Sequence, residues 1–224
     1  NDSGKIVMTG SDIEPTEGNF YWIQVGQDID GEAAIDNSGV SVSFSSDGET
    51  LAVGANNNDN DNGRDAGHVR VYRFSNIVNN WAQIGQDIDG ETQWGQSGYS
   101  VSLNENGSIL AIGAPWNNGE PETYILYRGQ VRVYRFDQET NKWNQIGQDI
   151  DGEGAGDNSG ISVSLNADGT ILAIGDNYNL GIGSGRVRVY KNIRDNWQQL
   201  GAHIVGEAED NYSGFSVSLS ADGL

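Results

Sequence analysis

The feature that most constrains the fold of this chain is an internal repeat. A segment of the form Trp-x-Gln-Ile-Gly-Gln-Asp-Ile-Asp-Gly-Glu occurs three times almost unchanged and a fourth time in degraded form. The four copies begin at Trp22, Trp81, Trp143 and Trp197, so they lie 59, 62 and 54 residues apart. Periods of this size indicate one supersecondary unit that is stacked several times along the chain.

Each repeat contains four short stretches with the composition of β-strands. The first follows a Ser-Gly pair and alternates serine with apolar residues, as in Gly39–Phe44. An Asp-Gly or Asn-Gly dipeptide comes next and favours a type I′ hairpin, because these residues accept a positive φ. The apolar stretch Leu51–Ala55, the stretch Val69–Tyr72 and the Trp segment complete the unit. Four antiparallel strands per 54–62 residues predict an all-β propeller, and the missing 3.6-residue apolar period predicts almost no helix.

The repeats also predict the domain organisation. Residues 1–20 form an N-terminal segment that holds a strand of a preceding blade, and residues 21–224 form tandem blades. The first strands start near residues 39, 98, 160 and 214, and the last repeat is truncated. Since seven blades of this length need roughly 400 residues, we expect a fragment of a larger, about seven-bladed propeller. A four-bladed ring closed by the two ends is the alternative.

Charge and composition exclude several classes of function. The chain carries 32 acidic and 12 basic residues, for a net charge of −20. Nucleic acids and anionic membranes need a basic surface, so neither is an expected partner. No apolar run approaches the length of a membrane-spanning helix, and the absence of cysteine rules out disulfides and thiolate metal sites. Divalent cations and basic protein surfaces suit the charge best.

One stretch resembles a known repeat family. Ser97–Pro115 has an aromatic residue beside glycine at its start, Gly98-Tyr99, and ends on Gly113-Ala114-Pro115. In these features it is similar to the FG-GAP repeat of integrin α chains and of large surface proteins from marine bacteria and algae. The resemblance covers about residues 20–224 and implies an extracellular or cell-surface propeller. The calcium loop of that family, Asp-x-Asp-x-Asp-Gly, is reduced here to segments such as Ser45–Gly48, which offer too few oxygen ligands for calcium.

Two other groups of acidic residues are candidate calcium sites. The loop between the second and third strands of the first repeat is rich in oxygen ligands and contains Asp59, Asp61 and Asp65. A weaker candidate is the acidic segment that recurs in each repeat, which would form a ring at one end of the propeller. Its aspartates are Asp28, Asp30, Asp87, Asp89, Asp149 and Asp151. The alternative for both groups is a set of solvated turns.

No catalytic motif is present, so the sequence predicts a protein that is not an enzyme. The chain lacks zinc-protease, nucleophile-elbow and phosphate-loop patterns, and its two histidines, His68 and His203, belong to no motif and are expected to be structural.

The predicted function is a calcium-stabilised extracellular adhesion module. Its partners would be proteins or polysaccharides at the cell surface, or further copies of itself. One alternative is a structural subunit of a filament, sheath or surface layer. Another is a carbohydrate-binding propeller that uses Trp94 and Trp116 as stacking platforms, since both lie outside the repeated Trp series.

Overall fold

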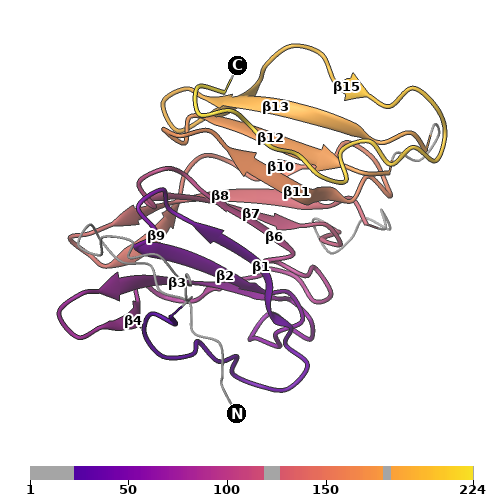
Figure 1. Cartoon of the computed structure of the whole chain (residues 1–224). Coiled ribbons are helices and arrows are strands. Elements are labelled where there is room, and N and C mark those ends of the chain that lie inside the picture. Colours follow the sequence, from indigo (N-terminus) through magenta and orange to yellow (C-terminus); the bar gives the residue numbers. More distant parts are fainter. Residues whose placement is uncertain (1–22, 119–126, 179–182, 224) are drawn as a thin grey trace, which may run out of the picture.

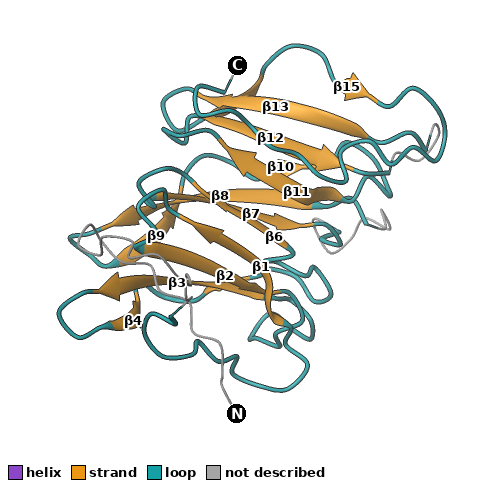
Figure 2. Cartoon of the chain, in the orientation of Figure 1, coloured by secondary structure: helices purple, strands orange, loops and turns teal. Residues whose placement is uncertain are grey.

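The computed structural model describes residues 23–118, 127–178 and 183–223. All regular structure in these residues is β-strand, as predicted, and the strands form three antiparallel sheets stacked side by side (Figures 1 and 2). The described residues contain no helix that would be long and apolar enough to cross a membrane. The strand predicted within residues 1–20 lies outside the described residues.

Each sheet corresponds to one repeat. Sheet 1 contains β1 (Ser38–Phe44), β2 (Thr50–Ala55), β3 (His68–Ser75), β4 (Asn80–Gln83) and β5 (Ile88–Asp89). Sheet 2 contains β6 (Ser100–Leu103), β7 (Ile109–Ala114), β8 (Gln130–Asp137), β9 (Lys142–Gln145) and β10 (Ile150–Asp151). Sheet 3 contains β11 (Ser159–Leu165), β12 (Ile171–Asp176), β13 (Arg186–Asn192), β14 (Trp197–Gln199) and β15 (Ile204–Val205).

The sheets have one more strand than the sequence predicts. In sheet 1 the order is β1-β2-β3-β4, and β5 pairs with the other half of β3. The eight residues of β3 exceed the four of β4, so the start of β3 has a free edge that β5 fills at His68 and Val69. The chain turns between β4 and β5 at Gly85, whose φ is +75°.

The hairpin between the first two strands is also not the predicted type I′ turn. Its main-chain bond runs from the N–H of Gly48 to the carbonyl of Ser45, and only Gly48 of the Asp47-Gly48 pair has a positive φ. This is the four-residue turn with a left-handed glycine that hairpins also use.

The core lies between the sheets and depends on small residues in the second strands. All six residues of β2, β7 and β12 are buried. A Cβ atom on Gly113 of β7 would overlap the carbonyl oxygen of Gly160, the second residue of β11 in sheet 3. Glycine at this position therefore allows neighbouring sheets to approach closely.

A tryptophan joins each sheet to the one before it at the outer edge. The indole Nε1 of Trp143 donates to the carbonyl of Ile84 at 3.1 Å, and the Gln86 side chain bonds to both the main-chain N–H and carbonyl of Trp143. Trp197 makes the same contacts with Ile146 and Gln148. The repeated Trp and Gln-Ile-Gly-Gln elements are therefore two halves of one inter-sheet contact.

Candidate functional site

Three repeat-related side chains come together in each sheet where its third strand begins. The first position, where the strand begins, holds His68, Gln130 or Arg186. The other two positions come from the acidic segments before and after each sheet. They are held by Glu32 and Asp87 in sheet 1, Glu91 and Asp149 in sheet 2, and Glu153 and His203 in sheet 3. An arginine lies two residues further along the third strand in every sheet.

In sheet 3 these positions form a saturated, buried ion network. The Arg186 guanidinium contacts Glu153 at 2.9 Å, Asp157 at 2.5 Å and Asp176 at 3.0 Å. Arg188 contacts the same Asp176 at 2.7 Å. Burial raises the pKa of Asp157, and the Gly154 main-chain N–H and the Arg186 guanidinium compensate this cost in part. Every charge in the network has a partner, which indicates a structural role.

Sheet 2 uses an uncharged version of the same contact. The Gln130 side chain donates from Nε2 to Asp149 at 3.1 Å and accepts from the Asn117 amide at 3.0 Å. Arg132 pairs with Glu91 at 3.1 Å. The side chain at the first position, Gln130, therefore has hydrogen-bond partners on both its amide nitrogen and its amide oxygen.

Sheet 1 differs because its first position holds an imidazole without a hydrogen bond. Only 4% of His68 is exposed, and within the described part of the chain neither ring nitrogen has a hydrogen bond. Its Nδ1 atom lies 4.0 Å from Glu32 Oε2. Burial lowers the pKa of His68 below its usual 6.5, and the nearby Arg70 charge lowers it further. Both effects favour the neutral form of the imidazole.

The residues around His68 explain why its ring has no hydrogen-bond partner. Ala55 occupies the place of the buried Asp176, so no acid approaches from the second strand. Asp36, the counterpart of Asp157, accepts a hydrogen bond from the Asn58 amide at 3.1 Å instead. Arg70 bridges Glu32 and Asp87, with its Nε atom 3.0 Å and its NH2 atom 2.7 Å from the Asp87 carboxylate.

This arrangement supports acid–base chemistry and offers a set of metal ligands. Burial lowers the pKa of His68, and the Glu32 carboxylate beside the ring would stabilise the imidazolium whenever His68 took a proton from a reacting group. Ligand atoms of Glu32, His68 and Asp87 all lie within 4.8 Å of one another, and this is the one such group of three in the described residues. A cation held by all three would compete with Arg70 for both carboxylates.

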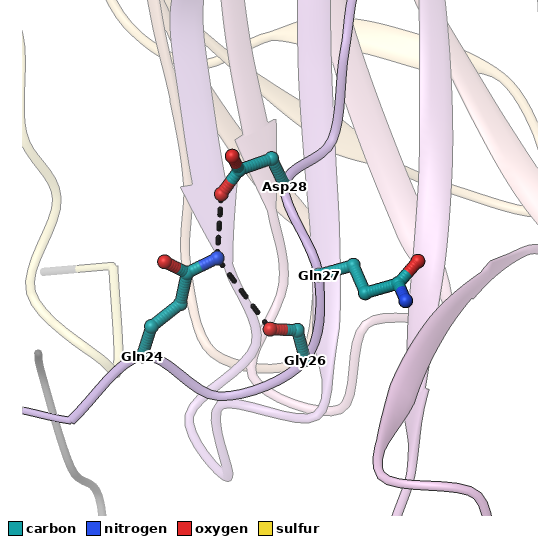
Figure 3. Close-up of a pocket in the computed structure, with 4 residues that line it drawn as sticks. All are labelled: Gln24, Gly26, Gln27 and Asp28. Carbon is teal, nitrogen blue, oxygen red and sulfur yellow. Dashed lines mark hydrogen bonds between the residues drawn. The ribbon is translucent and has the colours of Figure 1, made fainter.

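The other predicted acidic ligands lie in separate pairs. In the recurring segment, the first aspartate accepts a hydrogen bond from the glutamine four residues before it. These pairs are Gln24 and Asp28, Gln83 and Asp87, and Gln145 and Asp149. Figure 3 shows the first pair beside an open cavity of about 400 Å³, lined by Gln24, Gly26, Gln27 and Asp28. Of the three aspartates, Asp87 alone belongs to the cluster of three ligands.

The second aspartates of these segments, Asp30, Asp89 and Asp151, do not join that cluster either. Asp89 and Asp151 lie in β5 and β10, where burial raises their pKa values. A calcium ring at this end of the stack stays a prediction.

The predicted calcium loop of the first repeat is held by contacts within itself. Asp59 accepts a hydrogen bond from the main-chain N–H of Asp65 at 2.8 Å, and Asp65 pairs with Arg64 at 3.5 Å. Asp61 is exposed. Calcium binding by these three residues stays a prediction.

The two tryptophans predicted to stack on sugars have neighbours of their own. The Arg64 guanidinium lies 4.9 Å from the centre of the Trp94 ring. Trp116 packs edge-on against Tyr99, with their ring centres 4.9 Å apart.

Comparison with solved structures supports a propeller-like fold. A candidate 6-phosphogluconolactonase from Bacteroides fragilis matches with a TM-score of 0.52 and 13% identity over 78% of this chain and 40% of that one. Sqt1 from Saccharomyces cerevisiae matches with a TM-score of 0.49 and 13% identity over 79% and 38%. The periplasmic gluconolactonase PpgL from Pseudomonas aeruginosa has a TM-score of 0.37 and 17% identity over 82% and 62%. No family model and no curated protein sequence matches the chain.

These findings confirm the coarse fold and correct the family. Of these three structures, the first has a TM-score above 0.5, and at 13% identity it establishes the fold alone. The chain spans less than half the length of that structure. The resemblance to FG-GAP repeats is wrong, because no family model matches the chain and the solved structure that shares its fold is a candidate lactonase instead. The number of blades in the whole protein stays a prediction.

The function derived from that resemblance is corrected with it. The non-enzymatic adhesion module is wrong, and neither a structural surface-layer subunit nor a carbohydrate-binding propeller is retained. The expectation that the chain is not an enzyme is corrected as well, because the solved structure that shares its fold is a candidate lactonase.

Sequence reasoning missed Glu32 and His68 as site residues. A signal was present in the alignment of the repeats, where His68 stands at the position of Gln130 and Arg186. The residues around this position are similar in all three repeats, so the change to His68 shows that sheet 1 lacks the structural contact which Gln130 and Arg186 make in the other two sheets.

Proposed function

We propose that this chain contributes a catalytic site to a propeller hydrolase that opens sugar lactones. The observation that carries the proposal is the buried, neutral imidazole of His68, which has no hydrogen bond at a position where the other two sheets hold satisfied donors. Titratable groups whose pKa values are shifted by burial and by nearby charges are typical of catalytic sites.

The proposed reaction is the addition of water to the lactone carbonyl. As the water oxygen bonds to the carbonyl carbon, His68 takes one water proton. The carbon–oxygen bond of the ring then breaks, and the departing ring oxygen receives that proton from His68. The product is the open-chain hydroxy acid, and the imidazole returns to its neutral form.

Two neighbours support His68 in this role. The Glu32 carboxylate lies next to Nδ1, where it favours a proton on that atom, leaves Nε2 free to act as the base and stabilises the imidazolium that forms. The separation of 4.0 Å exceeds a hydrogen bond, as catalytic contacts often do before substrate binds. Arg70 holds both Glu32 and Asp87 and so positions the carboxylate.

The substrate class comes from the shared fold and from the charge of the chain. The solved structure that supports the fold is a candidate lactonase for a phosphorylated sugar acid. A chain with a net charge of −20 repels a phosphorylated substrate at long range. An uncharged sugar lactone, such as glucono-1,5-lactone, is therefore the better candidate.

Glu32, His68 and Asp87 would also hold a divalent cation if Arg70 released their carboxylates. A bound cation would polarise the lactone carbonyl and lower the pKa of a bound water. One imidazole and two carboxylates suit zinc or manganese better than calcium, which takes six to eight oxygen ligands. We therefore propose a transition-metal ion for this site in preference to calcium.

The test is hydrolysis of glucono-1,5-lactone, measured as acid release above the spontaneous rate. His68→Gln copies the residue that sheet 2 carries and so preserves packing while removing the base. We expect this variant to lower kcat/KM by roughly 100-fold or more, the usual contribution of a general base. His203→Gln, the matched change at the other histidine, is expected to leave the rate unchanged. Equal rates for wild type and His68→Gln would reject the proposal.

A further inference from the structure

The Glu32 carboxylate beside His68 is held on both of its oxygen atoms. Arg70 binds Oε1, and the side-chain amide of Asn58 donates from Nδ2 to Oε2 at 3.4 Å. Oε2 is also the oxygen that lies 4.0 Å from His68 Nδ1. Asn58 therefore contacts the carboxylate oxygen whose position decides how well Glu32 supports the imidazole.

Asn58 is itself fixed within the fold. It is 5% exposed, its main-chain N–H donates to the Ala55 carbonyl at 3.1 Å, and its carbonyl accepts from the Gly67 N–H at 2.9 Å. The side-chain nitrogen donates to Asp36 Oδ2 at 3.1 Å as well as to Glu32. An amide nitrogen carries two hydrogens, so this one side chain can serve two carboxylates at once.

The segment that follows Glu32 has a strained backbone. Ile35 has a φ of +82°, a conformation that β-branched residues rarely adopt. Sheet 3 has Gly156 at the same position, with a φ of +74°, where glycine accepts the conformation without strain. A strained backbone persists only where surrounding contacts hold it in place.

The contacts that hold this segment run through Asp36 to Asn58. The Asp36 carboxylate accepts from the Ala33 main-chain N–H at 3.2 Å, and its main-chain carbonyl accepts from the Asn57 N–H at 3.2 Å. Asn58 thus binds both the start of the segment, at Glu32, and its middle, at Asp36. Without Asn58 the segment is free to relax and to carry Glu32 away from the imidazole.

Sheet 2 shows what the same asparagine does beside an uncharged first position. Asn117 occupies the place of Asn58 and donates to Gln130 Oε1 at 3.0 Å. In sheet 1 the asparagine binds the acidic neighbours of His68 instead of the side chain at the first position. The donor that orders the first position in sheet 2 therefore orders a carboxylate in sheet 1.

We propose that Asn58 is a positioning residue that holds Glu32 against His68. The inference rests on the proposed function, in which Glu32 stabilises the imidazolium that forms when His68 takes a proton from water. Asn58 is buried, so it acts through Glu32 and not on the substrate. Its loss should therefore lower kcat and leave KM unchanged.

The kinetic test measures kcat and KM for glucono-1,5-lactone in Asn58→Ala, in Glu32→Gln and in the double variant. We expect Asn58→Ala to lower kcat by roughly 10- to 100-fold at an unchanged KM, because a displacement of about 1 Å costs a rate factor of this order. In the Glu32→Gln background the same substitution should cause no further loss. An unchanged kcat, or an equal loss in both backgrounds, would overturn the proposal.

The matched control is Asn117→Ala, the same substitution at the same position of sheet 2, where the side chain is also buried. It should lose stability in urea as Asn58→Ala does but keep the wild-type kcat. Circular dichroism should show that all variants keep their β-structure. A fall in kcat for Asn117→Ala as large as that for Asn58→Ala would show a general loss of stability and reject the positioning role.

Urea unfolding of the same variants tests the contact without reference to activity. The effects of Asn58→Ala and Glu32→Gln should be non-additive by roughly two- to tenfold in the unfolding equilibrium constant, as expected for one hydrogen bond. If the wild type opens no lactone, the proposed function fails, and this coupling still decides whether Asn58 holds Glu32. Additive effects would overturn the positioning role whatever the activity.

Discussion

Replacing Trp143 by alanine tests whether the tryptophans hold the sheets together. Trp143 is 3% exposed, and its ring lies against Gly85, where an added Cβ would be 2.5 Å from Cδ1. Removing a buried tryptophan side chain costs about 3–5 kcal/mol. The lost bond to the Ile84 carbonyl adds about 1 kcal/mol, since that carbonyl is left without its donor. We therefore expect a loss of about 4–6 kcal/mol in the free energy of unfolding.

Trp81 provides the matched comparison, because it occupies the same repeat position in a less buried setting. It is half-buried, and its ring packs against the exposed Phe44 as well as Phe74. Trp81→Ala should therefore cost about half as much, in proportion to the apolar area that it removes from water. Trp143→Phe keeps an aromatic ring but loses the indole N–H, so about 1–2 kcal/mol is expected.

Urea unfolding monitored by circular dichroism gives these differences directly. With a slope of about 2–3 kcal/mol per molar urea, Trp143→Ala should lower the midpoint by roughly 2 M. A loss for Trp143→Ala no greater than that for Trp81→Ala would refute the idea that these contacts join the sheets.

Three further predictions concern the charged positions. Asp176→Asn removes the acidic partner of the buried Arg188 and one of the three acidic partners of Arg186, and urea unfolding should show a loss of about 3–5 kcal/mol. Because the His68 pKa is lower in the folded chain than in the unfolded one, the unfolded chain binds more protons below about pH 6.5, and stability should fall as the pH drops. Thermal melts at pH 7 and pH 5 should show that His68→Gln removes part of this acid-induced loss, and an unchanged loss would contradict it. Calorimetric titration should detect one zinc site that Glu32→Gln abolishes, whereas binding retained in that variant would place the metal elsewhere.

Much of the fold could be predicted because the same strand and turn patterns recur in every repeat. Strand β1 contains the alternating segment Gly39–Phe44, and β2 contains the apolar segment Leu51–Ala55. Both could be predicted because the two strands are neighbours in the sequence and pair with each other. The fifth strand of each sheet could not be predicted. Ile88–Asp89 is too short to show a pattern, and it forms because β3 is longer than β4.

The incorrect family arose from residues that the packing of the sheets requires. Gly98 donates its main-chain N–H to the Gly113 carbonyl at 3.1 Å, and both glycines lie where adjoining sheets approach each other closely. Glycines beside an aromatic residue and before Ala-Pro therefore report close packing of sheets, which unrelated propellers can share. Such a motif carries information about the fold rather than about the family.

The candidate site was harder to predict because it depends on differences between copies. His68 has no motif around it, and Glu32 belongs to a segment that looks identical in three repeats. What sets them apart is that Ala55 stands in the place of Asp176 and that His68 stands in the place of the hydrogen-bonded Gln130. These differences become visible only when the sheets are compared position by position. The extracellular location predicted from sequence stays a prediction.

The most direct test of the proposed function is a single comparison of lactone hydrolysis by wild type and His68→Gln at pH 7. If His68 is the base, the wild-type chain accelerates the opening of glucono-1,5-lactone above the spontaneous rate. The variant then falls to that rate while its melting temperature is unchanged or slightly raised, because glutamine can bond to Asp87 as Gln130 does to Asp149. A wild-type chain that gives no acceleration, or a variant as active as the wild type, would contradict a catalytic role for this cluster.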